Sequence, residues 1–250
     1  MTLLDLALFV AAGLVGGAVN SLAGGAKLFV FPLLLATGLP PIMANATGTV
    51  ALWPAQLPAI WMHRRGLAGR LRAVLWRMAP AVVGTLCGAG LLIISSEAVF
   101  LAVIPFVLVG AVTTIALGNR TAIVMARLIP PRRRGAATGA LMFGAGVYGG
   151  FFGAGMGFLL IAVITLAGVS SIREANAEKN ITATAINTTA VVPFLASGLV
   201  HLPAAAGVLV GGLAGGYIGG HLARLLPDAP MRLVVAGLGL VLTIAFLFGR

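Results

Sequence analysis

Long apolar runs, separated by short polar or glycine-rich stretches, dominate this chain of 250 residues. The runs predict membrane segments at 3–22, 26–38, 43–62, 78–95, 98–117, 135–152, 155–169, 175–199, 203–223 and 231–248. Most of them reach the roughly 18 apolar residues that mark a candidate transmembrane helix. The segments at 26–38 and 155–169 are shorter, and we expect them either to span fully or to re-enter the membrane. The pattern is typical of an all-α polytopic membrane protein with about 8–10 membrane segments, some of them broken or re-entrant.

One arrangement of polar and apolar residues occurs twice, first over 16–54 and again over 149–193. Each copy has a glycine cluster, an apolar run that ends in Gly38 or Gly168, and an Ala-Asn-Ala sequence that opens a helix rich in Thr and Asn. Interrupted hydrophobic segments in corresponding halves point to the binding site of a transporter. We expect a single membrane transport domain that comprises repeat one (1–118), a cytoplasmic connector (119–134) and repeat two (135–250).

Positive charge sets the expected orientation of the segments. Apart from Lys27 and Arg250, all basic residues fall in four groups along the chain. These groups are Arg64, Arg65, Arg70, Arg72 and Arg77; Arg120, Arg127, Arg132, Arg133 and Arg134; Arg173 and Lys179; and Arg224 and Arg232. Because cytoplasmic loops carry an excess of Lys and Arg, we expect all four groups inside the cell. The two halves then have opposite orientations and form inverted-topology repeats, which place a substrate site near the midplane of the membrane.

Composition separates this chain from soluble proteins. Its residues are 60% hydrophobic and only 8% charged, whereas about a quarter of the residues in a soluble domain are charged. The net charge of +11 would suggest a nucleic-acid partner in a soluble protein, but here the arginines fill short connectors. We therefore expect a lipid bilayer and no nucleic acid as the partner, in a multi-pass protein of the cytoplasmic (inner) cell membrane. A homodimer is compatible with the sequence.

Sequence motifs for catalysis and metal binding are missing. Cys87 is the single cysteine, so neither an internal disulfide nor a cysteine metal cluster can form. His63, His201 and His221 do not have the spacing of metal ligands. The chain also lacks the zinc-protease, nucleophile-elbow and phosphate-loop motifs. We expect no enzymatic activity, no cofactor and no metal.

Candidate binding residues gather at the two glycine clusters. Gly24 and Gly25 permit backbone conformations that other residues avoid, and they expose N–H groups. The helix that follows would begin inside the membrane, where its unpaired N–H groups and its dipole favour an anion. Gly155 and Gly157 offer the same arrangement in the second half. The alternative is that these glycines only allow helices to pack closely.

Lys27 follows the first glycine cluster and has apolar neighbours on both sides, while Asn20 and Ser21 lie shortly before the cluster. An ammonium group inside a membrane is costly unless it has a partner. Three placements are open: contact with an anionic substrate, snorkelling to the membrane surface, or pairing with a carboxylate. The chain has five carboxylates, none of them obviously at the same depth: Asp5, Glu97, Glu174, Glu178 and Asp228.

Polar side chains recur after each interrupted segment. Asn45 and Thr49 are four residues apart and share a helix face, and Thr182 and Asn187 follow in the second half. Such side chains can bind an oxyanion through neutral donors, or they can form hydrogen bonds between helices. The charged pair at 178–179 either adds charge to the second site or marks the cytoplasmic end of its helix.

These motifs are similar to those of the sulfite exporter TauE/SafE family of membrane transporters. The resemblance rests on GGAVNSLAGG at 16–25, FPLLLATGLPP at 31–41, ANATGTVALWP at 44–54 and GGFFGAGMG at 149–157, and it covers almost the whole chain. It implies transport of small sulfur-containing anions, such as sulfite and organosulfonates, across the cytoplasmic membrane. Lys27 departs from the family pattern, in which a small or apolar residue tends to follow the glycine pair.

The residues and the resemblance together predict a secondary transporter or facilitator that exports a small anionic substrate by alternating access. An anion that leaves a negative interior gains about 2.3 kcal/mol per charge per 100 mV, so we expect export to need no coupling ion. The predicted site comprises Asn20, Ser21, Gly24, Gly25, Lys27, Asn45, Thr49, Gly155, Gly157, Thr182 and Asn187. An anion channel and a non-transporting membrane scaffold or assembly protein are the alternative functions.

Overall fold

The computed structural model describes residues 3–23, 25–57, 69–117 and 120–222, together with the single residues 60, 67, 237 and 241. The helices are α1 (Leu3–Ala23), α2 (Lys27–Ala36), α3 (Pro41–Leu52), α5 (Leu71–Ile94), α6 (Glu97–Leu117), α7 (Arg120–Leu128), α8 (Arg134–Phe151), α9 (Met156–Leu166), α10 (Ile172–Ala196) and α11 (Leu202–Leu222). Short 3₁₀ segments, η1 (Pro54–Gln56) and η3 (Pro131–Arg133), continue α3 and precede α8. Within these ranges the structure contains no strand, as the sequence predicts.

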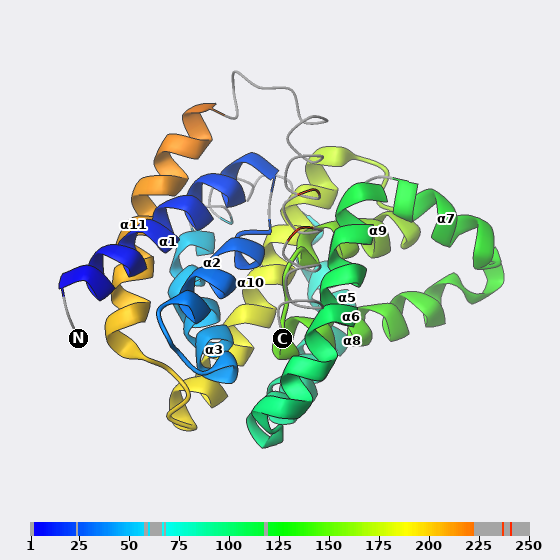
Figure 1. Cartoon of the computed structure of the whole chain (residues 1–250). Helices are drawn as coiled ribbons and strands as arrows, with labels where there is room; N and C mark the ends of the chain where they lie inside the picture. The colour runs from blue at the N-terminus through cyan, green and yellow to red at the C-terminus, as the bar shows by residue number, and fades with distance from the viewer. Residues whose placement is uncertain are drawn as a thin grey trace.

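Two long helix pairs, α1 with α11 and α5 with α8, lie on opposite sides of the molecule (Figure 1). Glycines allow each pair to approach closely. A Cβ atom on Gly211 of α11 would lie 1.9 Å from the carbonyl oxygen of Val10, and one on Gly88 of α5 would lie 2.0 Å from that of Val147. Real Cβ atoms essentially never come within 3.0 Å of another atom. Small residues thus allow backbone-to-backbone packing, which stabilises helix pairs in membranes.

Helices α2, α3 and α10 lie between the two pairs (Figure 1). Phe31 of α2 is fully buried at the centre of the largest apolar cluster. Its ring meets those of Phe100 from α6 and Phe152, next to the end of α8, edge to face, at centroid distances of 6.0 and 5.3 Å. Edge-to-face contacts of this kind add to the stabilisation from burial. The core therefore joins both halves of the sequence around α2.

Large apolar side chains cover the outside of the long helices. Ile94 is 80% exposed and Phe106 is 79% exposed. Helices α1, α5, α6 and α11 each contain at least 18 residues of sufficient hydropathy to cross a bilayer. Extensive exposed apolar surface is unfavourable in water and marks a surface that another apolar phase covers. These features are those of a multi-pass membrane protein.

The helices α2 and α9 are short, with 10 and 11 residues respectively. At 1.5 Å per residue they reach about 15 and 17 Å, about half the thickness of the hydrocarbon core. Each follows a glycine with positive φ: Gly25 has φ of 85° and Gly155 has φ of 69°. Glycine adopts this region without the penalty that a Cβ imposes. The matched glycines therefore let the chain turn sharply into each short helix.

Several predicted boundaries differ from the observed helices. Helix α5 begins at Leu71 rather than at 78, because arginines in its first turns lower the local hydropathy without interrupting the helix. Helix α3 ends at Leu52 and η1 follows it, while residues 58, 59, 61 and 62 of the predicted segment 43–62 lie outside the described residues. The predicted connector 119–134 contains α7, in which the apolar stretch between Arg120 and Arg127 is too short to indicate a membrane segment. The predicted segment 231–248 lies outside the described residues except for 237 and 241.

Candidate functional site

Lys27 begins α2 and is buried, with 8% of its surface exposed. Its ammonium donates a hydrogen bond to Thr49 Oγ1 at 2.5 Å and lies 5.5 Å from the centroid of the Phe152 ring. A cation within about 6 Å of an aromatic face is attracted by the ring. In the described part of the chain, its neighbours are thus a hydroxyl and a ring, while the carboxylates of Glu174 and Glu178 pair with arginines elsewhere.

The hydroxyl that accepts from Lys27 belongs to a buried polar cluster on α3. Thr49 Oγ1 donates to the backbone oxygen of Asn45 at 3.0 Å, so its proton is already used. Asn45 Nδ2 donates to the carbonyl oxygen of Phe151 at 2.8 Å. The other amide atom, Asn45 Oδ1, is buried and has no hydrogen-bond partner among the described residues. The cluster therefore connects the first half of the chain to the end of α8 in the second half.

The same side of α3 continues into η1 with further contacts to α10. Trp53 Nε1 donates to Thr188 Oγ1 at 2.7 Å, and Asn187 Nδ2 donates to Gln56 Oε1 at 3.0 Å. Residues three or four apart share a helix face. We call this run the α3 polar face; its members are Asn45, Thr49, Trp53 and Gln56. Each member forms a hydrogen bond with another element of the structure.

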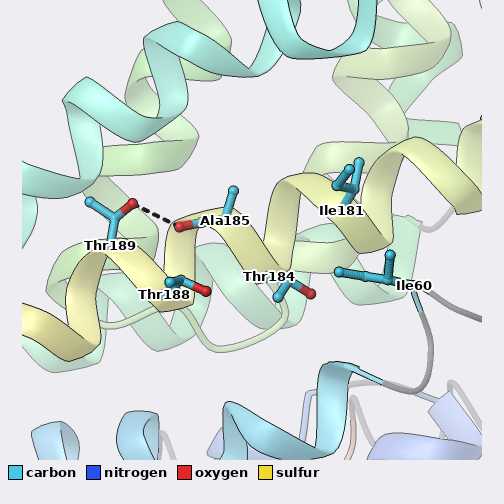
Figure 2. Close-up of a pocket in the computed structure, with 6 residues that line it drawn as sticks. All are labelled: Ile60, Ile181, Thr184, Ala185, Thr188 and Thr189. Atoms are coloured by element: carbon cyan, nitrogen blue, oxygen red, sulfur yellow. Dashed lines mark hydrogen bonds between the residues drawn. The ribbon is translucent and has the colours of Figure 1, made fainter. Parts of the chain in front are cut away.

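A cavity of about 310 Å³ lies along α10 at the end of this face. Figure 2 shows its lining side chains along α10, with one side chain from a separate segment. The lining residues are Ile60, Ile181, Thr184, Ala185, Thr188 and Thr189. A water molecule takes about 30 Å³ in the liquid, so a small hydrated ion would fit. Thr188 both lines the cavity and accepts from Trp53, so the cavity and the α3 polar face are connected.

Gly155 lines a second cavity, of about 260 Å³, between α6, α8 and α9. Its other lining residues include Val107, Ala111 and Leu159, which are apolar. The buried hydroxyl of Tyr148 donates to the carbonyl oxygen of Ala154 beside this cavity. That bond leaves few polar groups for an anion on this side of the second glycine cluster.

The other predicted residues are spread over several elements. Asn20 is exposed near the end of α1. Ser21 belongs to α1, but its side chain is not described, and Gly24 lies outside the described residues. Gly157 stands in the first turn of α9, where a Cβ would lie 3.6 Å from the Lys179 side chain. Their roles in binding therefore stay predictions.

Thr182 of α10 differs from the other predicted threonines. It is 1% exposed, and its hydroxyl has no hydrogen-bond partner among the described residues. By contrast, the Thr184 hydroxyl donates to the backbone of its own helix. A buried hydroxyl without a partner carries a desolvation cost, so it calls for a ligand or a water molecule.

Sequence reasoning did not identify Phe151 and Phe152 as neighbours of the first site. The Phe151 carbonyl and the Phe152 ring complete the surroundings of Asn45 and Lys27. A backbone acceptor has no sequence signal. The two phenylalanines do stand inside the second glycine cluster, GGFFGAGMG, and that position was the available indication.

Comparisons with known proteins agree with these features. The model of the family described as sulfite exporter TauE/SafE matches residues 9–246. A curated relative from Haemophilus influenzae, described as a probable membrane transporter protein, is 29% identical over 174 residues. This match covers 65% of the chain and 64% of the relative's length. No solved structure matches the chain. Because the family model covers nearly all of the sequence, the chain belongs to the sulfite exporter TauE/SafE family.

Proposed function

We propose that this protein is a secondary transporter or facilitator that exports small sulfur-containing anions, such as sulfite and organosulfonates, across the cytoplasmic membrane. Family membership and a relative described as a membrane transporter support a role in transport. The buried ammonium of Lys27, held by a hydroxyl and an aromatic ring, is the observation that carries the choice of an anion. Among the residues that the structure describes, Lys27 forms no ion pair with a carboxylate, and an anionic substrate would supply the missing negative charge.

The proposed substrate site lies at the α3 polar face, beside Lys27. Lys27 supplies the positive charge, and Asn45 and Thr49 position the ammonium and hold α3 against α8. Neutral donors of the second half, among them Thr182 and Asn187, complete the path along α10. The glycine turns at 25 and 155 each precede the N-terminus of a short helix, whose first N–H groups favour an anion.

The proposed architecture consists of two inverted repeats, 1–118 and 135–250, with α2 and α9 as re-entrant helices. The helix pairs support this proposal because they cross between the halves in a reciprocal manner. The first helix of one half, α1, packs on α11, and the first helix of the other, α8, packs on α5. The matched positive-φ glycines at 25 and 155 and the shortness of α2 and α9 support it as well.

In the proposed orientation the arginine-rich connectors face the cytoplasm of a cell whose inner membrane holds the protein. A divalent anion would then leave downhill by about 4.6 kcal/mol at 100 mV, since each charge contributes about 2.3 kcal/mol. Lys27 compensates one charge of such an anion while it is bound. Export would therefore need no coupling ion, and the two halves would rock about the site to give alternating access.

Efflux from proteoliposomes tests this proposal. Purified protein is reconstituted, the vesicles are loaded with sulfite or an organosulfonate, and efflux is followed at a fixed membrane potential. A carrier predicts a rate that saturates with internal concentration and rises when external anion is available for exchange. A channel predicts a rate that does not saturate and shows no exchange. The absence of flux with every anion, from folded protein, would support the scaffold or assembly role instead.

A further inference from the structure

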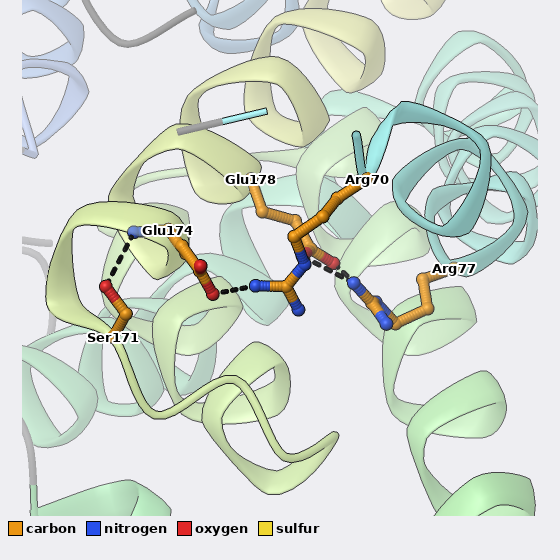
Figure 3. A network of polar contacts seen from close by, with 5 residues as sticks. All are labelled: Arg70, Arg77, Ser171, Glu174 and Glu178. Atoms are coloured by element: carbon orange, nitrogen blue, oxygen red, sulfur yellow. Dashed lines mark hydrogen bonds and ion pairs between the residues drawn. The ribbon is translucent and has the colours of Figure 1, made fainter. Parts of the chain in front are cut away.

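Two arginines near the start of α5 meet two glutamates near the start of α10 (Figure 3). The guanidinium of Arg77 on α5 forms a bidentate pair with the carboxylate of Glu178 on α10: Nε donates to Oε1 at 2.6 Å, and Nη2 donates to Oε2 at 2.7 Å. Arg70, at the N-cap of α5, pairs with Glu174 in the first turn of α10. The glutamates are four residues apart and so share one face of α10.

The two pairs differ in burial. The side chains of Arg70 and Glu174 are 35% and 37% exposed, so this outer pair lies in contact with solvent and contributes little to stability. In the inner pair, Glu178 is only 3% exposed, while Arg77 keeps 23% of its side-chain surface exposed. A buried carboxylate needs a partner, so the Arg77 fork satisfies Glu178. The Arg77 side chain therefore stays partly exposed, although the carboxylate that it holds is buried.

The inner pair resembles an oxyanion-binding site in which the Glu178 carboxylate occupies the position of the ligand. A guanidinium fork fits two coplanar oxygen atoms, which a carboxylate, a sulfonate or sulfite all present. One turn further along the same face of α10 stands Thr182, whose buried hydroxyl has no partner among the described residues. A hydroxyl without a partner, one helical turn from the glutamate that Arg77 holds, is suited to a third oxygen, which Glu178 does not possess.

We propose that Arg77 is a subsite for the transported oxyanion, and that the Glu178 carboxylate occupies the place of the substrate in this conformation. The incoming anion displaces Glu178 from the fork and takes an additional hydrogen bond from Thr182. This inference rests on the proposed function, because it takes the ligand to be the transported anion. It names a second anion-binding residue, on α5, besides Lys27 on α2.

Displacement of Glu178 from Arg77 would couple anion binding to a separation of α5 from α10. When the anion takes the fork, the bond between α5 and α10 at this point is lost, and the freed Glu178 carboxylate must reach water. Leu67, Val74 and Ala177 pack together at the same end, so the apolar contact there would have to loosen as well. Glu178 is therefore a built-in competitor that closes this end of the molecule until an anion replaces it.

A binding titration with the full-length protein in detergent or nanodiscs tests the proposal, with sulfite and sulfate as probes. In Glu178→Gln the competing charge is gone, but the side chain keeps its size. Because a hydrogen bond to a charged group contributes about 1.5–3 kcal/mol, we expect the dissociation constant for sulfite to fall about tenfold or more. In the double variant Arg77→Gln with Glu178→Gln, the gain should disappear. Glu174→Gln, in the exposed outer pair, is the matched control and should change affinity less than about twofold.

An unchanged or weaker affinity in folded Glu178→Gln would overturn the proposal, and so would a gain that survives the loss of Arg77. If Glu178→Gln does not fold, Arg77→Lys in the otherwise native chain provides the test. Lysine keeps the charge but lacks the fork. We expect this variant to bind sulfite more weakly than the native protein, and equal binding would contradict the proposal.

The outcomes separate this inference from the proposed function. Saturable efflux that depends on Lys27, together with unchanged affinity in Glu178→Gln, would reject the Arg77 subsite and leave the transporter standing. A gain in affinity that depends on Arg77, without efflux of any anion by the native protein, would leave Arg77 as an anion-binding residue and reject the transport function. Binding is measured without transport, so neither result depends on the other.

Discussion

Substitution of Gly88 by alanine tests the close packing of α5 against α8. The added Cβ would lie 2.0 Å from the carbonyl oxygen of Val147 and 2.8 Å from its carbonyl carbon. Ordinary van der Waals contact begins at 3.4 Å, so the two helices have to separate by about 1 Å or more at this point. Overpacking of a well-packed interface costs about 1–3 kcal/mol.

Gly90 lies on the same helix, and a Cβ there would meet nothing within 4 Å. Gly90→Ala is therefore the matched control, because both substitutions change helix propensity in the same direction, by about 1 kcal/mol in favour of the helix. We expect Gly88→Ala to be less stable than Gly90→Ala by about 1–3 kcal/mol. Unfolding in mixed micelles with increasing SDS, followed by far-ultraviolet circular dichroism, measures the difference. Equal stability of the two variants would refute the backbone contact between the halves.

Two further predictions concern the turn at the second glycine cluster and the buried amide of α3. Gly155→Ala should lower stability by about 1–2 kcal/mol, since φ of 69° puts a Cβ against the next carbonyl. Gly157→Ala should be tolerated, because its Cβ would lie 3.6 Å from the Lys179 side chain, an ordinary van der Waals contact. The same SDS titration compares the two variants. Asn45→Ala leaves the Phe151 carbonyl without its donor and should cost about 1–3 kcal/mol. Unaltered unfolding of Asn45→Ala would show that the hydrogen bond from Asn45 to the Phe151 carbonyl does not contribute to stability.

The helical architecture could be predicted because apolar segment length is a direct physical requirement of the bilayer. The start of α1 at Leu3 and of α6 at Glu97 agree with hydropathy to within a residue. The start of α5 could not be predicted in this way. Arg72 and Arg77 lower the hydropathy of its first turns, yet Arg77 is satisfied by Glu178, a residue far away in the sequence. Helix α7 was missed because short amphipathic helices lack an apolar run.

The candidate site was predictable only in part. Lys27 and Thr49 could each be singled out as polar residues in an apolar context, but their contact depends on how α2 folds back on α3. The partners from the second half, the Phe151 carbonyl and the Phe152 ring, depend on the approach of the C-terminal end of α8 to α3 and Lys27. Tertiary contacts of this kind arise from the meeting of two glycine clusters, and no local pattern encodes which atoms then face one another.

The most direct test of the central claim is sulfite efflux from proteoliposomes at a controlled membrane potential, for the native protein beside Lys27→Met and Lys27→Arg. We expect the native protein to show saturable efflux that increases as the interior becomes more negative. Efflux should fall at least about tenfold in Lys27→Met, because the lost contact to a charged group contributes about 1.4 kcal/mol or more. Lys27→Arg keeps the positive charge and should retain part of the efflux. Folded Lys27→Met protein with native efflux at every potential would contradict the assignment of Lys27 to the anion site.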